Sequence, residues 1–132
     1  MKEVFEFSSR FRRLKGGLIS IINASNKYLG VTINKAGDII NIEQNINKSI
    51  INWQSFNIAN GETVNFNQPD KNSITLNIIV GSEKSIINGT LNSNGQVWFI
   101  NSNGILFDKN VKINTSGLLA STKYILNNDF LR

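Results

Sequence analysis

Apolar and polar positions alternate, or form short apolar runs, from Tyr28 to the end of the chain, and no stretch sustains helical spacing. Period-two alternation indicates extended backbone, because successive side chains of a strand point to opposite faces. The pattern predicts short strands at residues 31–34, 39–43, 55–58, 63–66, 74–80, 85–87, 96–100, 105–107, 111–113 and 123–126. Residues 46–53 are ambiguous between a turn of helix and a bend that leads into a strand.

The predicted strands are separated by corners that carry Asn-Gly four times, at positions 60–61, 88–89, 94–95 and 103–104. Asn-Gly favours two-residue hairpin turns, but it also suits a left-handed corner between the coils of a solenoid. Residues 86–89 and 112–115 repeat loosely as apolar-Asn-small, which would place them in register in stacked coils. The pattern alone leaves a solenoid and an antiparallel sandwich equally open.

In a solenoid, one set of side chains would point into a shared core. This set is Ile87, Leu91, Val97, Phe99, Ile105, Phe107, Val111, Ile113 and Leu118.

The composition favours many short strands with tight corners, because the 132 residues include 20 Ile and 22 Asn but a single Pro. The chain has no Cys, which removes disulfides and thiolate metal sites, and no His, which removes the usual general base. The carboxylates are scattered and form no calcium-loop series. We therefore expect no catalytic residues, no metal and no cofactor.

The net charge of +5 is concentrated at the start of the chain. Residues 1–30 carry six basic and two acidic side chains, whereas residues 31–132 carry eight and seven. The larger part therefore lacks the basic face that nucleic acid requires. Residues 1–30 run from basic to apolar to small, as in a leader or degenerate signal region, but the apolar part spans only residues 16–22. No segment is long enough to predict a transmembrane helix.

Five sequence blocks resemble the filamentous haemagglutinin N-terminal family, also called the haemagglutination-activity or two-partner secretion domain. They are IINWQSFNI at 50–58, GETVNFNQP at 61–69, SIINGTL at 85–91, NGQVWFINSNGILF at 94–107, and GLLAST at 117–122 with NDF at 128–130. The blocks follow the family's order and spacing. Two positions differ from the family pattern: Ile78 stands in place of an arginine, and Ser102 in place of a proline.

The resemblance implies an all-β fold, a right-handed parallel β-helix with an N-terminal cap and short antiparallel extra strands. Residues 31–132 would form this domain, truncated at its C-terminal end, and the chain would be a monomer. The function implied is secretion targeting of a bacterial exoprotein of adhesin, haemagglutinin or toxin type. Its partner would be an outer-membrane transporter with periplasmic docking domains, and its destination the cell surface or medium, through the periplasm of a Gram-negative bacterium.

Two groups of residues are candidate contact sites. A fixed turn with amide side chains could be bonded by the transporter, although the same residues could simply form a coil corner. This turn comprises Asn101, Ser102, Asn103, Gly104 and Ile105. Trp53 and Phe56 could form an exposed aromatic contact, or a core or capping cluster at the solenoid end.

Three other interpretations of the sequence remain open. A surface adhesin fragment could bind host glycans or matrix through an Asn-rich face. A polysaccharide-active β-helix enzyme is an analogy of fold alone, and the missing His argues against it. The chain could also be the product of a fragmentary or decayed gene.

Overall fold

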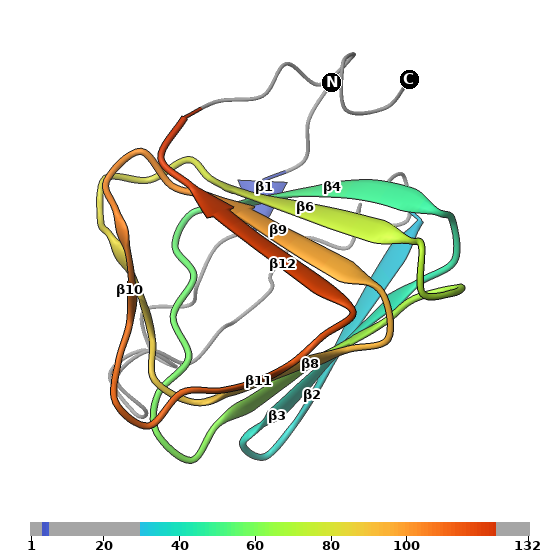
Figure 1. Ribbon diagram of the computed structural model, residues 1–132, viewed down its shortest axis with the longest axis horizontal. Coiled ribbons are helices and arrows are strands. Elements are labelled where there is room, and N and C mark those ends of the chain that lie inside the picture. The colour runs from blue at the N-terminus through green and yellow to red at the C-terminus, as the bar shows by residue number, and fades with distance from the viewer. Residues whose placement is uncertain (1–3, 6–29, 124–132) are drawn as a thin grey trace.

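The computed structural model describes residues 4–5 and 30–123, and these form an all-strand solenoid of about four turns. Viewed along the solenoid, each coil is roughly triangular, as Figure 1 shows. The strands are β1 (Val4–Phe5), β2 (Val31–Ala36), β3 (Ile39–Gln44), β4 (Lys48–Trp53), β5 (Thr63–Asn67), β6 (Ile74–Ile79), β7 (Ser85–Ile87), β8 (Thr90–Ser93), β9 (Gln96–Ile100), β10 (Ile105–Phe107), β11 (Lys112–Asn114) and β12 (Gly117–Ser121).

Three sheets form the sides of the triangle. Sheet A has the order β1-β4-β6-β9-β12, sheet B the order β11-β8-β5-β3-β2, and sheet C pairs β10 with β7. Every pairing is parallel except that of β2 with β3, which is an antiparallel hairpin. The fold is therefore the expected right-handed parallel β-helix, and it excludes the antiparallel sandwich.

Sheet A has apolar side chains on both faces. Ile51, Trp53, Val97 and Phe99 belong to the main core cluster in the solenoid interior. The alternate positions of the same strands form a second cluster on the outer face, made of Ile50, Leu76, Ile78 and Ile100 with Ile74 and Trp98 packed against it. A strand that is apolar on both faces shows no alternation. This explains why residues 46–53 are ambiguous in sequence, although they contain the regular strand β4.

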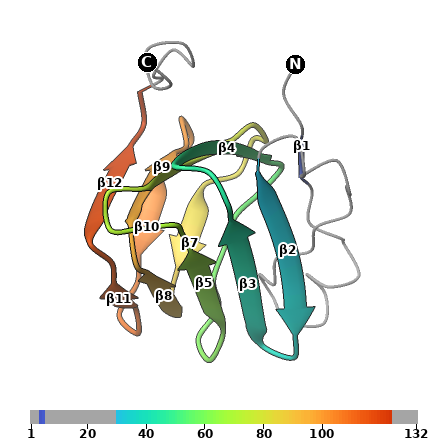
Figure 2. The same cartoon turned by 90° about the vertical axis from the view of Figure 1, so that its right-hand side faces the viewer.

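Sheet B mostly alternates, with apolar side chains inside and polar ones outside, although Ile39 is 43% exposed on the outer face and Gln44 is buried. Ile40, Val64 and Leu91 point into the core, and each is followed by an asparagine that is exposed or half-buried. Figure 2 shows β2, β3, β5, β8 and β11 side by side in this sheet. The alternation made its strands β2, β3, β5 and β11 predictable from the sequence.

Several strand predictions are corrected by the structure. Residues 55–58 form no strand and contribute a single bridge, from Ile58 to Ile87. Strands β8 and β12 were not predicted, because the glycines Gly89 and Gly117 mark them as corners. Of the strand predicted at 123–126, residue 123 lies in a bend and the rest falls outside the described residues.

The proposed repeat between residues 86–89 and 112–115 is wrong. The observed register pairs Ile105 with Ser85 and Lys112 with Thr90, so residues 20 and 22 positions apart stack on one another. The spacings differ because the corners between strands contain different numbers of residues. Among the predicted inward residues, Ile87, Leu91, Val97 and Phe99 are fully buried. Ile105, Phe107, Val111 and Ile113 are half-buried against them. Leu118 aligns with buried Val97 yet is 38% exposed.

The solenoid begins with a cap. The hairpin strand β2 covers the outer edge of β3 in sheet B, and β1 pairs with β4 at the corresponding edge of sheet A. The leader prediction for residues 1–30 otherwise lies outside the described residues. Within the described part of the chain, no helix is long and apolar enough to cross a membrane.

Candidate functional site

The turn at residues 101–105 connects β9 in sheet A to β10 in sheet C, so it occupies one corner of the triangle. The Asn101 side chain is fully buried, and its Nδ2 donates to the carbonyl oxygen of Glu83 and to Ser85 Oγ, both at 3.0 Å. Asn101 Oδ1 accepts the backbone N–H of Asn103 at 2.9 Å. A buried amide side chain whose donor and acceptor atoms are all hydrogen-bonded holds the corner in one shape. Asn101 is therefore a structural residue of the turn.

The exposed part of the turn consists of Ser102 and Asn103. Asn103 Nδ2 donates to the carbonyl oxygen of Gly81 in the preceding coil at 2.8 Å, which ties the two corners together. Gly104 has φ of 112°, a conformation that side-chain-bearing residues rarely adopt. The turn thus keeps a defined shape with serine, not proline, at position 102. Ser102 and Asn103 are the side chains of the turn that a partner could reach.

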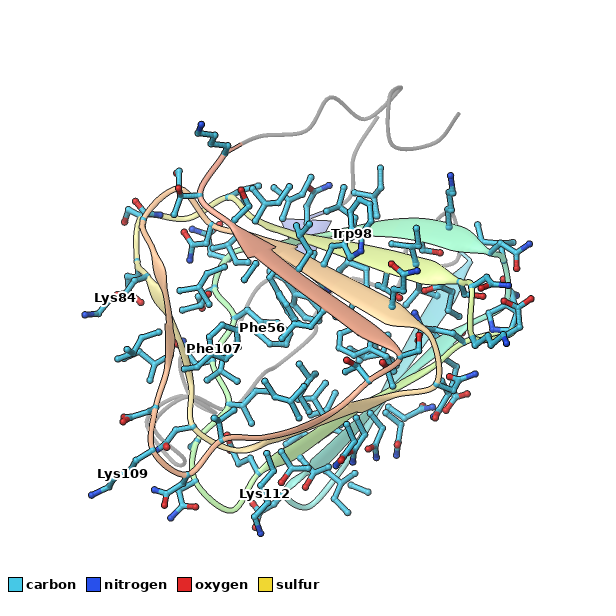
Figure 3. The ribbon with its side chains drawn as sticks, viewed as in Figure 1. Phe56, Lys84, Trp98, Phe107, Lys109 and Lys112 are labelled. Carbon is cyan, nitrogen blue, oxygen red and sulfur yellow. The ribbon has the colours of Figure 1, made fainter. Side chains whose placement is uncertain are left out.

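The aromatic residues Trp53 and Phe56 lie inside the solenoid, each with 0% exposure. Their ring centroids are 5.1 Å apart in an edge-to-face arrangement, and Phe56 lies 4.9 Å from Phe99. Trp53 Nε1 donates to the Oδ1 of buried Asn77 at 2.8 Å. Figure 3 shows Phe56 pointing inward toward the same space as Phe107. Neither Trp53 nor Phe56 is available as a surface contact in the folded chain.

A ladder of asparagines crosses the outer face of sheet B, and the sequence analysis missed it. Asn65 Nδ2 donates to Asn41 Oδ1 at 2.9 Å, Asn92 Nδ2 to Asn65 Oδ1 at 2.9 Å, and Asn114 Nδ2 to Asn92 Oδ1 at 3.0 Å. The bonds join residues 24, 27 and 22 positions apart. The available signal was an apolar residue followed by Asn in each sheet B strand. We call these four residues, Asn41, Asn65, Asn92 and Asn114, the asparagine ladder.

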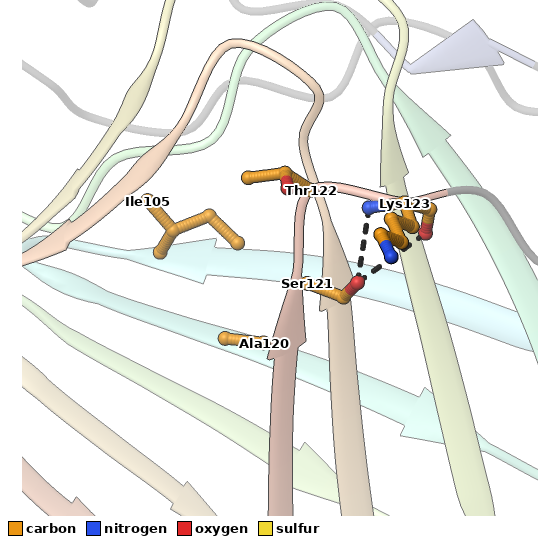
Figure 4. Close-up of a pocket in the computed structure, with 5 residues that line it drawn as sticks. All are labelled: Ile105, Ala120, Ser121, Thr122 and Lys123. Carbon is orange, nitrogen blue, oxygen red and sulfur yellow. Dashed lines mark hydrogen bonds between the residues drawn. The ribbon is translucent and has the colours of Figure 1, made fainter.

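The far end of the solenoid is formed by β10, β11 and β12. A hollow of about 350 Å³ opens there, lined by Ile105, Ala120, Ser121, Thr122 and Lys123, as Figure 4 shows. The Ser121 hydroxyl accepts the backbone N–H of Lys123 at 3.0 Å, which bends the chain directly after β12. In the ranges 4–5 and 30–123, no cluster of three His, Cys, Asp or Glu side chains is placed to hold a metal ion.

The stacked coils, the capped first end and the Asn-rich corner define a protein of the parallel β-solenoid class. Comparison with known proteins identifies the family. The model of the TPS secretion domain matches residues 21–130, and the chain therefore belongs to the two-partner secretion domain family.

Named relatives agree with this assignment. The chain is 39% identical over 94 residues to a heme/hemopexin-binding protein of Haemophilus influenzae, and 37% identical over 91 residues to the protein of that name from strain KW20 Rd. These matches cover 70% and 69% of this chain but 10% of each relative. The chain therefore spans about a tenth of the length of these relatives.

A solved structure gives the same result for the fold. The crystal structure of the HMW1 secretion domain from Haemophilus influenzae superposes with a TM-score of 0.75 at 39% identity. The superposition covers 78% of this chain and 27% of that one. The expected family and fold class are both confirmed.

Proposed function

We propose that this chain is a secretion-targeting domain that a partner outer-membrane transporter recognises through the periplasmic docking domains of that transporter. The family match over residues 21–130 carries the proposal, because exoproteins of this family leave Gram-negative bacteria through the periplasm. The domain acts in this proposal by binding, with no catalytic role. Its destination is the cell surface or the medium.

The turn at residues 101–105 is the part of the folded domain that we assign to transporter contact. Support comes from the different burial of the side chains in the turn. Asn101 is buried and satisfied, whereas Ser102 is exposed on a corner whose shape is fixed from beneath. A rigid, exposed polar corner can be bound without a large entropy cost of ordering.

A titration tests this proposal. The probe is the purified periplasmic region of a two-partner secretion transporter from the same organism, and calorimetry measures its binding to the folded chain. We expect saturable binding that Ser102→Asp weakens about tenfold, which is the effect of about 1.4 kcal/mol. Asn60→Asp is the matched control, because it adds the same charge to another exposed corner and should leave the affinity within about twofold.

The same titration on the urea-unfolded chain, diluted rapidly into the probe, separates two modes of recognition. Binding of the unfolded chain alone would mean that exposed strand edges, not the folded turn, add to a sheet of the docking domain. That outcome would retain the secretion role and overturn the assignment to residues 101–105. Absence of binding by both forms would overturn the proposed function.

The activity that the names of the relatives describe is not extended to this chain. Heme and hemopexin binding are properties of proteins of which the chain matches about a tenth. This sequence also has no His or Cys, two of the side chains that commonly hold haem iron. Adhesin, haemagglutinin and toxin roles would belong to whole exoproteins, and we leave the type open.

A further inference from the structure

The chain contains four Asn-Gly pairs, and the structure places them in four different surroundings. The pairs occupy residues 60–61, 88–89, 94–95 and 103–104. In such a pair, the backbone nitrogen of the glycine can attack the side-chain Cγ of the asparagine, because glycine has no side chain to obstruct the approach. The attack closes a succinimide ring and releases ammonia. It requires an asparagine side chain that turns freely and a glycine N–H without a hydrogen bond.

The pair Asn94-Gly95 is held by Gln68 of the preceding coil. Asn94 Oδ1 accepts the backbone N–H of Gln68 at 2.7 Å, and Asn94 Nδ2 donates to the carbonyl oxygen of Gln68 at 2.6 Å. The backbone N–H of Gly95 donates to Gln68 Oε1 at 2.8 Å. Ring closure would break the hydrogen bonds of both reacting groups, so the folded chain protects this pair.

The pair Asn103-Gly104 is held in a similar way within the turn at residues 101–105. Asn103 Nδ2 donates to the carbonyl oxygen of Gly81 at 2.8 Å and to Asn101 Oδ1 at 3.0 Å. The backbone N–H of Gly104 donates to the carbonyl oxygen of Asn101 at 3.0 Å. The attacking group and the amide that it would attack are therefore both hydrogen-bonded here as well.

The pair Asn88-Gly89 is held by a hydrogen bond and by packing. Asn88 Oδ1 accepts the backbone N–H of Asn110 at 3.0 Å, and Gly89 is buried. A Cβ at Gly89 would lie 2.4 Å from the carbonyl oxygen of Ala59 and 2.5 Å from that of Glu62, so the neighbouring coil leaves no room around this glycine. Ring closure at this pair would require the two coils to separate.

The pair Asn60-Gly61 differs from the other three. Both residues are exposed, and apart from the chain neighbours no atom lies within 4 Å of the position that a Cβ on Gly61 would take. Among the described residues, neither the Asn60 side chain nor the Gly61 N–H has a hydrogen-bond partner. The turn is closed instead by its end residues: the Glu62 N–H donates to the Ala59 carbonyl oxygen at 2.9 Å, and the Ala59 N–H donates to Glu62 Oε1 at 2.8 Å. Both reacting groups are therefore free.

We propose that Asn60 is a site of spontaneous deamidation in the folded chain, whereas the other three Asn-Gly pairs are protected by the fold. The Gly61 nitrogen bonds to Asn60 Cγ and gives its proton to solvent, and the side-chain amide leaves as ammonia. Water then opens the succinimide. Hydrolysis of the bond from the nitrogen to Cγ gives aspartate, and hydrolysis of the bond from the nitrogen to the backbone carbonyl carbon gives isoaspartate. The net reaction consumes one water and releases one ammonia.

The closed turn around Asn60 should favour aspartate over isoaspartate. Isoaspartate would add one methylene to the main chain between residues 60 and 61, inside a turn whose ends are joined by two hydrogen bonds. The carbonyl oxygens of Ala59 and Glu62 also lie against Gly89 of the next coil, where no space remains. A longer main chain would therefore open the turn or displace that coil, whereas aspartate keeps the length of asparagine.

The test incubates the full chain at mildly alkaline pH, folded in one sample and unfolded in urea in the other. Protease digestion and tandem mass spectrometry then measure the deamidated fraction at each of the four asparagines over time. In urea, all four should react at comparable rates, because each is followed by glycine in an unrestrained chain. In the folded chain, Asn60 should react at least about tenfold faster than each of the others, because their hydrogen bonds and packing must open first. Circular dichroism verifies that the chain stays folded.

Two variants isolate the cause. Asn60→Gln keeps the amide but would have to close a larger ring, so it should remove the fast reaction and leave the other three sites as slow as before. Asn60→Asp supplies the expected product, and the main species that the folded chain forms should coelute with it in ion-exchange chromatography. An isoaspartate methyltransferase assay should find a smaller share of isoaspartate in the folded chain than in the unfolded chain.

Equal rates at the four pairs of the folded chain, or a faster reaction at Asn94 or Asn103 than at Asn60, would overturn the inference. Slow reaction at all four pairs of the folded chain, with rapid reaction in urea, would overturn it as well, because the turn itself would then protect Asn60. An equal isoaspartate share in both samples would contradict the role given to the closed turn. No transporter takes part, so the outcome is independent of the proposed secretion role.

Discussion

The two ends of the solenoid are built from the same coil pattern but differ in burial. At the first end, Val31, Ile40 and Trp53 are 0–2% exposed beneath the hairpin and the adjoining strands. At the last end, Leu118 is 38% exposed although it aligns with Val97, which is fully buried one coil earlier. An inward aliphatic side chain therefore becomes core only when a neighbouring coil covers it. Each coil depends on its neighbours to complete the burial of its core residues.

Truncation of aromatic side chains should show the largest contrast between the ends. Trp53→Ala empties a fully buried site and removes the hydrogen bond to Asn77, so it should lower the free energy of unfolding by about 3–5 kcal/mol. Phe107→Ala acts on a half-buried ring of the last coil and should cost about 1–2 kcal/mol. Urea denaturation followed by tryptophan fluorescence or circular dichroism measures both. Equal losses would mean that the last coil is covered as well as the first.

Glycine substitutions should give a smaller contrast. A Cβ at Gly89 would lie 2.4 Å from the carbonyl oxygen of Ala59 and 2.5 Å from that of Glu62, both of them backbone atoms. Gly89→Ala should therefore destabilise the chain by about 1–3 kcal/mol. A Cβ at Gly117 would meet only the Gln96 side chain, at 3.1 Å or more, and that side chain can move. Gly117→Ala should change the urea midpoint little, and a comparable loss at both positions would contradict this account.

Substitutions in the asparagine ladder should have the smallest effect on stability. Asn65→Ala removes two ladder bonds, one to each neighbouring coil, and should cost about 1–2 kcal/mol. Asn114→Ala removes a single exposed bond and should cost about 0.5 kcal/mol or less. The urea midpoints of the two variants provide the measurement. A larger loss of stability at Asn114 than at Asn65 would contradict the view that each ladder bond contributes similarly to the stacking of the coils.

Sequence alone predicted most of the strands, either from alternation or, as for β6 and β9 of sheet A, from short runs rich in apolar residues. Alternation revealed β3 and β5 because an apolar residue inside follows a polar one outside. It failed for β4, where Ile50 and Ile51 are both buried on opposite faces. It also failed for β8 and β12, each of which follows or begins with a glycine. The sequence blocks that resemble the family, rather than periodicity, decided between a solenoid and a sandwich.

The site was harder to predict than the fold. The turn at residues 101–105 could be located, but only coordinates show that Asn101 is buried while Ser102 is exposed. The asparagine ladder escaped detection because its members are 24, 27 and 22 residues apart. Because the corners between strands differ in length from coil to coil, residues that stack regularly in space are spaced irregularly in the sequence. Register must be known before such a column can be recognised.

Native-state hydrogen exchange, resolved by residue, tests most directly whether the solenoid has one closed and one open end. The account predicts the slowest exchange for the amides of β4, β6 and β9, which are paired on both edges, and faster exchange for β11 and β12. Uniform protection from β4 to β12, or protection that increases toward β12, would contradict it.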